Sequence, residues 1–377
     1  MNIDLGVDAL SPQLTGIGRY TLELIYGLRS HPSIHSLRAV YQGQEINDPS
    51  CLLRGDQPFP RYQRTRLYRN LTLARNWILP RHSLYHGPNF MLPSHIDGGI
   101  ITVHDLSVCK YPETHPPERI AHFERDFGRS LERAWHVITD TETVKKELME
   151  FANIPADRIT AVHLGVSDAY RPERQNDGSV RYADYGIDSG GYILLVATFE
   201  PRKRIDAALK AFALLPEKVK KRFPLVLAGA TGWRNEHLYE QLSQDEDKGY
   251  IRFLGYVPEE YLPGIYSGAR LFLYPSIYEG FGLPPIEAMA SGVPVIVSNR
   301  SCLPEVTGGG AMMIDPDDVE GFSSAIERGV EDDIWRQQAI QAGLEIATRY
   351  KWKYCIENIV GIYQKIWCQH IASGIRP

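Results

Sequence analysis

Two glutamates, Glu279 and Glu287, flank a turn of glycines and prolines in the stretch SIYEGFGLPPIEAMA, residues 276–290. The two prolines favour the start of a helix, and the free N–H groups at a helix start bind anions. Gly282 would let these N–H groups approach a ligand, because glycine has no Cβ in the way. The glutamates could be a proton-transfer pair, two solvated charges, or the two ends of a clamp around a ligand.

Two cations follow a predicted strand in the stretch ATFEPRKRIDAAL, residues 197–209. Arg202 and Lys203 stand at the start of a predicted helix, where positive charge opposes the helix dipole. This placement argues against a merely exposed basic pair. Fixed cations would instead stabilise the negative charge that grows on a departing diphosphate. The stretch therefore predicts an electrostatic catalytic group.

Three further strand ends carry candidate ligand residues. TGIGRY places Gly16 at a strand-to-helix turn, ITVHDLS places His104 and Asp105 at a strand end, and YHGPNFMLP places His86 and Asn89 at another. Each signal has a structural alternative, since a single Gly-x-Gly is often only a tight turn and a lone histidine is more often structural. They remain candidates because ligands bind open α/β sheets at the carboxyl ends of strands.

Two Asp-x-Asp strings raise the question of a metal, since one class of sugar-transferring enzymes binds its metal through such a string. Asp315 and Asp317 lie in DPDD before a predicted helix, so Asp317 or Asp318 is expected to be an N-cap. Asp245 and Asp247 lie in the charged loop QDEDK. Neither string is near the glutamate stretch in order or type, so we expect no catalytic metal and no cofactor.

Short β-branched runs alternate with helical patterns along the chain, which predicts a doubly wound α/β fold. The series occurs twice, with a join near residues 165–190. We expect an N-terminal Rossmann-like domain, a C-terminal Rossmann-like domain and a helical tail that crosses back to the first domain, at residues 1–172, 185–355 and 356–377. Two such domains facing each other would place all the strand-end residues along an interdomain cleft.

The composition excludes several function classes. The chain has 377 residues, of which 43% are hydrophobic and 23% charged, as in ordinary globular proteins. A formal net charge of -5 gives no basic field for nucleic acid, so we expect no nucleic-acid partner. No apolar run is long enough to span a membrane, and five scattered cysteines indicate reduced thiols. We therefore expect a cytoplasmic protein.

One segment, residues 57–81, carries six arginines and no acidic residue, with aromatic and leucine residues between them. It is either a solvated helix face over a core stripe or an amphipathic basic surface that meets anionic lipid. The second interpretation predicts peripheral contact with the inner face of the cytoplasmic membrane.

The motifs together resemble a known family. EGFGLPPIE resembles the Glu-x7-Glu motif of retaining GT-B glycosyltransferases of glycosyltransferase family 4. TGIGRY, HD and EPRK precede this motif and LPE and DPDD follow it, all in family order, so the resemblance covers nearly the whole chain. EPRK and EGFGLPPIEAM look most like bacterial mannosyltransferases that build lipopolysaccharide O-chains. The resemblance implies two Rossmann-like domains of the GT-B type.

The resemblance also assigns roles around the donor, a nucleotide sugar. It implies that Glu279 lies by the sugar hydroxyls and that Glu287 holds the ribose, so the pair would be a clamp. Backbone N–H groups near the sugar and phosphates would come from Phe281, Gly282 and Leu283. Helix N–H groups between two hydroxyl-accepting carboxylates suit a sugar diphosphate.

The remaining assignments from the resemblance concern the phosphate and the acceptor. Gly16 would bring its N–H to the donor phosphate, His104 would lie near the sugar C6 hydroxyl and the reacting carbon, and Asp105 would orient it or hold the acceptor. Val257 joins the donor-binding set, and His86 and Asn89 the acceptor side. Many family members have Gly-Arg where this chain has Val196 and Ala197, so Arg202 could supply the missing guanidinium.

The expected function is a retaining hexosyltransferase that acts without a metal, with GDP-mannose the favoured donor and GDP-D-rhamnose, UDP-sugars and TDP-rhamnose open. The expected acceptor is a polyprenyl-diphosphate-linked or other glycan of O-antigen synthesis. A UDP-N-acetylglucosamine 2-epimerase-like isomerase on the same fold is one alternative. A non-catalytic sugar-nucleotide-binding subunit is another. A Rossmann dehydrogenase is disfavoured, because no GxGxxG follows the first strand.

Overall fold

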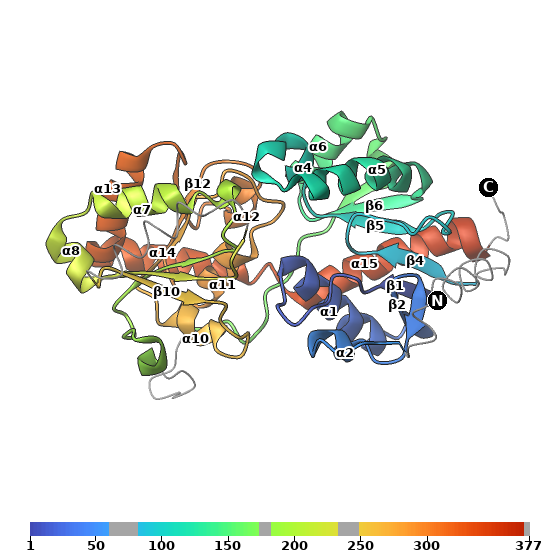
Figure 1. Cartoon of the computed structure of the whole chain (residues 1–377), viewed down its shortest axis with the longest axis horizontal. Coiled ribbons are helices and arrows are strands. Elements are labelled where there is room, and N and C mark those ends of the chain that lie inside the picture. Colours follow the sequence, from blue (N-terminus) through green and yellow to red (C-terminus); the bar gives the residue numbers. More distant parts are fainter. Residues whose placement is uncertain (60–81, 173–181, 233–248, 373–377) are drawn as a thin grey trace. The chain divides into compact units, whose positions relative to one another are not determined.

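The computed structural model describes residues 1–59, 82–172, 182–232 and 249–372 (Figure 1). The chain forms two compact units. The first comprises Met1–Leu106, Pro117–Gly165 and Trp352–Pro377, and the second comprises Ser107–Pro116 and Val166–Lys351. The second unit begins at Val166 rather than at residue 185 and includes Ser107–Pro116. The C-terminal segment of the first unit begins at Trp352, whereas the tail expected to cross back began at residue 356.

The first unit is built on a seven-stranded sheet in the order β3-β2-β1-β4-β5-β6-β7. All neighbours pair in parallel except β2 and β3, which are antiparallel. The central strands are fully buried, as expected for a parallel sheet with both faces covered. The strands are β1 (Asn2–Gly6), β2 (Ser36–Tyr41), β3 (Gln44–Ile46), β4 (Leu84–Gly87), β5 (Ile100–Val103), β6 (His136–Thr139) and β7 (Ile159–Ala161).

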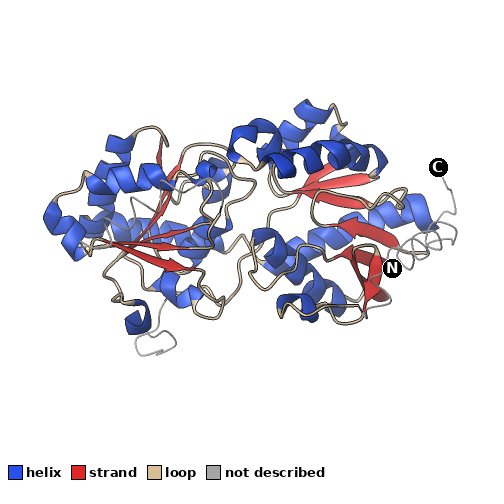
Figure 2. Cartoon of the chain, viewed as in Figure 1, coloured by secondary structure: helices blue, strands red, loops and turns tan. Residues whose placement is uncertain are grey.

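Helices cover both faces of this sheet (Figure 2). The apolar stripe of α1, which begins at Gly16, packs on the sheet and against the C-terminal helix α15. The helical elements of the first unit are α1 (Gly16–Ser30), α2 (Ser50–Leu53), α5 (Pro117–Arg133), α6 (Glu142–Ala152), η3 (Ala156–Arg158), α15 (Trp352–Trp367) and the π-helical turn η6 (Cys368–Ala372).

The second unit has a six-stranded, fully parallel sheet in the order β10-β9-β8-β11-β12-β13. Its strands are β8 (Ile193–Val196), β9 (Leu225–Ala228), β10 (Ile251–Gly255), β11 (Leu271–Tyr274), β12 (Val295–Ser298) and β13 (Met312–Ile314). In Figure 1, α7 and α13 lie together on one side of this sheet. The helical elements are α4 (Ser107–Lys110), η2 (Pro112–Thr114), η4 (Tyr182–Tyr185), η5 (Pro201–Lys203), α7 (Ile205–Ala213), α8 (Glu217–Arg222), α10 (Leu262–Ser267), α11 (Leu283–Ala290), α12 (Leu303–Thr307), α13 (Val319–Glu331) and α14 (Asp333–Ala347).

Each sheet has one point where the chain reverses its direction of winding. In the first sheet this point lies between β1 and β4, and in the second between β8 and β11. The loops that leave the two strands at such a point diverge and open a crevice at their carboxyl ends, where ligands bind. Two parallel-sheet Rossmann-like units were predicted, and the structure confirms them.

Two expectations about membranes concern different parts of the chain. Among the described residues, no helix combines the length and the apolar character that crossing a bilayer requires. The arginine-rich segment 57–81 lies outside the described residues from residue 60 onward, so its proposed contact with lipid stays a prediction.

The contact between α1 and α15 generates a prediction about stability. A Cβ at Gly27 of α1 would lie 2.5 Å from Cγ1 of Ile356 on α15, whereas a Cβ at Gly361 on α15 would meet nothing within 4 Å. Alanine is favoured over glycine in a helix by roughly 1 kcal/mol. We expect Gly361→Ala to stabilise the first unit by up to that amount and Gly27→Ala to lose the gain through the clash.

Urea unfolding of both variants tests this expectation. Ile356→Val removes Cδ1 of Ile356, which would lie 2.8 Å from the new Cβ, so the double variant Gly27→Ala/Ile356→Val should recover part of the loss. Equal stabilisation by both single alanines would contradict the tight packing of α15 on α1.

Candidate active site

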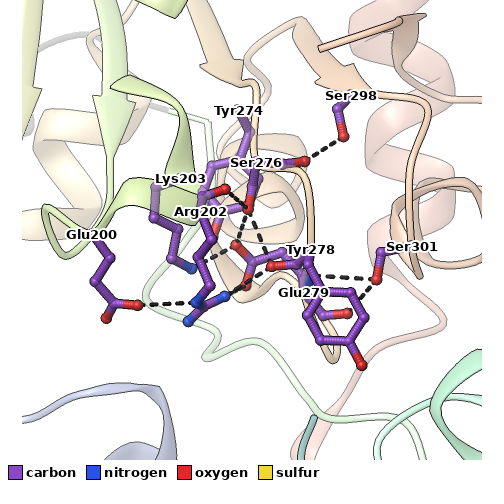
Figure 3. Close-up of polar contacts among 9 residues, drawn as sticks. All are labelled: Glu200, Arg202, Lys203, Tyr274, Ser276, Tyr278, Glu279, Ser298 and Ser301. Atoms are coloured by element: carbon purple, nitrogen blue, oxygen red, sulfur yellow. Dashed lines mark hydrogen bonds and ion pairs between the residues drawn. The ribbon is translucent and has the colours of Figure 1, made fainter. Parts of the chain in front are cut away.

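The loops after β8 and β11 meet at the switch point of the second sheet and are tied to each other (Figure 3). The carbonyl oxygen of Arg202 accepts a hydrogen bond from the backbone N–H of Ile277 at 2.9 Å, and the Ser276 hydroxyl oxygen lies 3.1 Å from it. In return, Nη1 of Arg202 donates to the carbonyl of Tyr278 at 2.8 Å. The two loops, far apart in sequence, therefore form one rigid edge.

Lys203 and Glu279 make a buried ion pair at this edge. Nζ of Lys203 donates to Oε1 of Glu279 at 2.5 Å and to the Tyr274 hydroxyl at 3.1 Å. The same Oε1 accepts a hydrogen bond from Ser276 at 2.6 Å. Lys203 is 8% exposed and Glu279 6%, so the pair is shielded from bulk water and its interaction is stronger than at a surface.

Arg202 joins a second carboxylate to the same cluster. Its Nε donates to Oε2 of Glu200 at 2.9 Å, and its Nη1 lies 3.3 Å from Oε2 of Glu279. The four side chains of Glu200, Arg202, Lys203 and Glu279 thus carry two positive and two negative charges, which balance. The guanidinium is engaged on both sides, so its orientation is fixed by the protein.

The ionisation of Glu279 follows from its partners. Burial alone would raise the pKa of this carboxyl, but the charges of Lys203 and Arg202 and the Lys203 and Ser276 hydrogen bonds lower it by more. The net pKa lies below its usual range, so Glu279 is a carboxylate at neutral pH. Burial and the Glu279 charge raise the pKa of Tyr274 well above its usual value, which keeps that hydroxyl protonated.

Serines hold the backbone on both sides of Glu279. The Ser301 hydroxyl donates to the Glu279 carbonyl at 2.6 Å and accepts from the Glu279 N–H at 3.2 Å. The Ser298 hydroxyl donates to the Ser276 carbonyl at 2.5 Å. Sequence patterns did not single out Glu200, Tyr274, Ser276, Ser298 or Ser301. A search for polar residues at the ends of β8, β11 and β12 would have found them.

The expected anion site begins where this loop enters α11. Gly282 is the N-cap with a φ of +86°, and a Cβ there would also lie 2.9 Å from Leu303. Two prolines occupy the first turn, as predicted, since they need no hydrogen-bond acceptor there. Leu283 starts the helix, and the Phe281 ring is buried edge-on against Tyr350, so Phe281 can offer a ligand only its backbone.

Glu287 and Val257 occupy different environments in the second unit. Glu287 lies in the second turn of α11 and is half-buried. Its charge, together with burial, raises the pKa of the Tyr266 hydroxyl well above the usual value, which places the two side chains close together. Val257 follows β10 and is 4% exposed, so its side chain is part of the core.

The first unit holds the other predicted residues. His104, at the end of β5, is buried with both ring nitrogens engaged. Nδ1 lies 2.8 Å from Oδ2 of Asp140 and Nε2 lies 2.8 Å from the Pro88 carbonyl. Asp105 is half-buried beside this pair and its charge contributes to the high pKa of His104. Gly16 is exposed at the first residue of α1, as an anion-binding helix start requires.

The structure corrects the expectation for His86. This histidine is completely buried in β4, where Nδ1 lies 2.6 Å from the Tyr363 hydroxyl and Nε2 lies 2.8 Å from the Thr102 hydroxyl. Burial and the nearby charge of His104 lower its pKa to about 3, so the ring is neutral. His86 links the sheet to α15 and does not line an acceptor site, because no face of its side chain is accessible.

A cavity of about 630 Å³ lies at the switch point of the first sheet. Its walls come from the loops after β1 and β4 and from α5, and the exposed side chain of Asn89 lies on its rim. Arg133 of α5 holds one wall in place, since its guanidinium donates to the carbonyl of Pro93 at 2.8 Å and of Leu92 at 3.1 Å. Asp8, Asn89, Asp126 and Arg129 give the cavity both acceptors and donors.

The aspartates of the DPDD string pair with arginines or cap a helix. Asp317 pairs with Arg204 at 2.7 Å, Asp315 pairs with Arg300 at 2.8 Å, and Asp318 caps α13 by accepting from Gly321 N–H, which confirms the N-cap prediction. Asp245 and Asp247 lie outside the described residues. Among the residues that the structure describes, no cluster of three His, Cys, Asp or Glu side chains has the geometry to hold a metal ion.

Solved structures share this architecture over almost the whole chain. Sucrose-phosphate synthase from Thermosynechococcus elongatus matches with a TM-score of 0.72 and 21% identity, covering 98% of this chain and 100% of that one. Anabaena Alr3699/HepE in complex with UDP and glucose matches with a TM-score of 0.72 and 16% identity, covering 97% and 100%. Two Rossmann-like units with this similarity to solved structures define the fold class as GT-B.

Sequence comparison identifies the family. Residues 184–345 match the family model described as "Glycosyl transferases group 1". O-antigen chain mannosyltransferase B of Escherichia coli is 36% identical over 379 residues, which cover 97% of this chain and 100% of that protein. The chain belongs to the group 1 glycosyltransferases and is a hexosyltransferase by class.

The ionisation of Glu279 generates a prediction about acid stability. Because its pKa is lower in the folded protein than its ordinary value of 4.5, its contribution to stability is present above pH 4.5 and is lost as the pH falls through the folded pKa. Glu279→Gln leaves Lys203 without a charged partner, which typically costs on the order of 3 kcal/mol at neutral pH. The difference from wild type should shrink below pH 4.5.

Urea unfolding at neutral pH and at a series of acidic pH values measures this difference. Glu345→Gln, at an exposed position on α14, is the control and should follow wild type throughout. A Glu279→Gln deficit that is independent of pH would mean that the carboxylate charge does not contribute.

Proposed function

We propose that this glycosyltransferase transfers mannose from GDP-mannose to a lipid-linked glycan, with retention of configuration, in O-antigen synthesis. The similarity to O-antigen chain mannosyltransferase B across both whole chains carries the choice of sugar and pathway. GDP-linked D-rhamnose is the second donor candidate. The Glu-x7-Glu resemblance to family 4 supports retention.

The cation cluster at the second switch point is suited to the departure of a nucleoside diphosphate. In this proposal Lys203, which the ion pair with Glu279 holds in place, offers its positive charge to the phosphate oxygen released from the anomeric carbon. Backbone N–H groups at the start of α11 add donors for the same phosphates. These groups together would do the work that a metal ion does in other sugar transferases, so we propose that no metal is required.

Glu279 is the group proposed to hold the transferred sugar. Its Oε1 accepts hydrogen bonds from Lys203 and Ser276, while its Oε2 lies 3.3 Å from Nη1 of Arg202. A carboxylate oxygen accepts more than one hydrogen bond, so Oε2 can accept from a sugar hydroxyl. Glu279 thereby positions the sugar next to Lys203, and Glu287 on α11 accepts from the ribose.

The transfer step needs no protein nucleophile in this proposal. The bond between the anomeric carbon and the phosphate oxygen breaks as the acceptor oxygen approaches on the same face, and a new carbon–oxygen bond forms. The acceptor proton passes to the released phosphate oxygen, which becomes more basic as the bond breaks. Lys203 stabilises this oxygen, and Arg202 holds Glu279 and the Tyr278 carbonyl in place.

We further propose that the acceptor glycan binds in the cavity of the first unit. The cavity lies at a switch point, its volume of about 630 Å³ is in the range of small-molecule sites, and its lining combines apolar side chains such as Met91 and Leu92 with polar ones. Asn89 on its rim and Asp8 at the end of β1 offer the acceptor and donor atoms that sugar hydroxyls need. The lipid part of such an acceptor would bring the protein to the membrane surface as a peripheral protein.

A transfer assay with purified protein tests the function. GDP-mannose, GDP-rhamnose, UDP-sugars and TDP-rhamnose are each offered with a polyprenyl-diphosphate-linked glycan, with and without EDTA. We expect transfer from GDP-mannose that survives EDTA. Release or epimerisation of the sugar without an acceptor would favour the isomerase alternative. Loss of transfer in EDTA with recovery on adding Mg²⁺ would overturn the metal-free proposal.

Lys203 provides the first mutational prediction for this function. Lys203→Ala removes the charge that faces the departing diphosphate, and losing one such electrostatic group costs on the order of a hundred- to thousandfold in turnover. Steady-state kinetics should show this loss in kcat. Lys210→Ala, on the exposed face of α7, is the matched control and should keep the wild-type rate. Near wild-type turnover in Lys203→Ala would remove this residue from the mechanism.

Substitution of each of the two glutamates of the clamp should have a different effect on GDP binding and on the kinetic constants. Glu287 is proposed to hold the ribose, so Glu287→Gln should weaken binding of free GDP and of the donor alike and raise KM more than it lowers kcat. Glu279 is proposed to hold the sugar, so Glu279→Gln should leave GDP binding nearly unchanged and lower kcat. Calorimetry with GDP and steady-state rates measure both effects. Equal weakening of GDP binding by the two variants would contradict the division.

A further inference from the structure

His104 is held between two groups that can only accept hydrogen bonds. The carboxylate of Asp140, which follows β6, lies 2.8 Å from Nδ1, and the carbonyl of Pro88, which follows β4, lies 2.8 Å from Nε2. Each nitrogen must therefore carry a proton for both bonds to form. The arrangement fits an imidazolium paired with a carboxylate that is only 2% exposed. Burial raises the pKa of Asp140, while the charge of His104 and its hydrogen bond lower it.

The loop that His104 holds is strained. Phe90 has a φ of +63°, which a bulky residue rarely adopts, and its N–H donates to the Thr102 carbonyl at 2.9 Å. Its ring packs edge-on against His104 at 5.8 Å and against Phe123 at 5.6 Å. Strained residues persist only where their surroundings over-determine them, and they cluster at functional sites. Here the surroundings are the His104 contact and the aromatic cluster.

The strained loop forms one wall of the cavity at the first switch point. Pro88, Asn89, Met91 and Leu92 all line that cavity. Asn89 is the exposed residue between the anchored Pro88 carbonyl and the anchored Phe90 N–H. Any movement of the Pro88 peptide would shift Asn89 relative to the cavity.

We propose that Asp140 is a positioning residue for the acceptor: it keeps His104 doubly protonated, and His104 in turn clamps the Pro88 carbonyl and thereby sets the loop that presents Asn89 to the acceptor glycan. The proposal rests on the proposed function, because it takes the cavity of the first unit as the acceptor site. Asp140 itself touches neither substrate. His104 acts here through the loop, whereas the family resemblance implies a contact with the sugar.

The electrostatic surroundings of the pair favour the charged form of His104. Burial lowers the pKa of His104, but the charge and hydrogen bond of Asp140, the Pro88 carbonyl and the charge of Asp105 raise it above its ordinary value of 6.5. The neighbouring titratable groups are His86 on β4, His163 after β7, Tyr20 on α1 and Cys355 on α15. Of these, His86 has a pKa of about 3 and is neutral, and burial raises the pKa values of Tyr20 and Cys355, so they are neutral too.

Raising the pH should weaken binding of the acceptor. As the pH rises through the raised pKa of His104, the imidazolium loses a proton and one of its two hydrogen bonds. The loop is then released, so KM for the acceptor should increase on the alkaline side while KM for the donor stays constant. Asp140→Asn removes the charge that stabilises the imidazolium, and an adjacent opposite charge shifts a pKa by about one unit or more. The alkaline rise in acceptor KM should move to lower pH by that amount.

The experiment measures acceptor KM and donor KM against pH for wild type and Asp140→Asn. Asp157→Asn is the matched control, because Asp157 lies near His136 at the opposite end of β6 and its charge acts on that histidine. The control should follow wild type at every pH. A loss of kcat in Asp140→Asn that is uniform with pH, or a change in donor KM with constant acceptor KM, would overturn the proposal, since a merely structural aspartate gives that result.

A second measurement does not depend on the folding of Asp140→Asn. The ring protons of His104 in the wild-type protein are titrated by NMR, with His104→Gln used to assign the signal. A midpoint above 6.5 is expected, and a midpoint at or below 6.5 would overturn the proposal. This titration also separates the two hypotheses. If the wild type transferred no sugar, the proposed function would fail, while the titration would still report the charged state of His104.

Discussion

The ion pair between Lys203 and Glu279 is the interaction on which the second unit's site depends. It joins a loop that follows β8 to a loop that follows β11, at the one place where the sheet's winding reverses. A buried pair of this kind is a weak source of net stability, because both charges lose their hydration. The pair instead contributes to the geometry of the site, because it holds the Lys203 ammonium group within hydrogen-bond distance of the Glu279 carboxylate. Contacts with Arg202, Ser276 and Ser301 hold these two residues in place.

In both sheets the loops that diverge at the switch point carry the candidate ligand-binding groups, but the chemistry of these groups differs. In the second unit the diverging loops carry balanced charges and a helix start, which suit a sugar diphosphate. In the first unit the diverging loops line a cavity that has both apolar and hydrogen-bonding groups, and the buried His104 ring holds one wall through the Pro88 carbonyl. The division matches a reaction in which one partner is strongly anionic and the other is a neutral array of hydroxyls.

The sequence was informative where a residue's role depends on its neighbours in the chain. The glycine and proline turn predicted the start of α11, DPDD predicted the N-cap of α13, and the alternating strand and helix patterns predicted two Rossmann-like units. It failed where the role depends on a distant partner. His86 looked like a strand-end ligand, but it is buried because Tyr363, 277 residues away, packs on it. Asp140 was overlooked although it ends a strand as His104 does, because its partner lies 36 residues earlier.

The return of α15 to the first unit affects the order in which the protein can fold as it is made. The first unit lacks the Tyr363 that hydrogen-bonds His86, and the face that packs on α1, until the last part of the described chain has emerged from the ribosome. The stretch Val166–Lys351 is one continuous piece and precedes α15 in synthesis. The second unit can therefore assemble while the first unit, although begun earlier, still waits for α15.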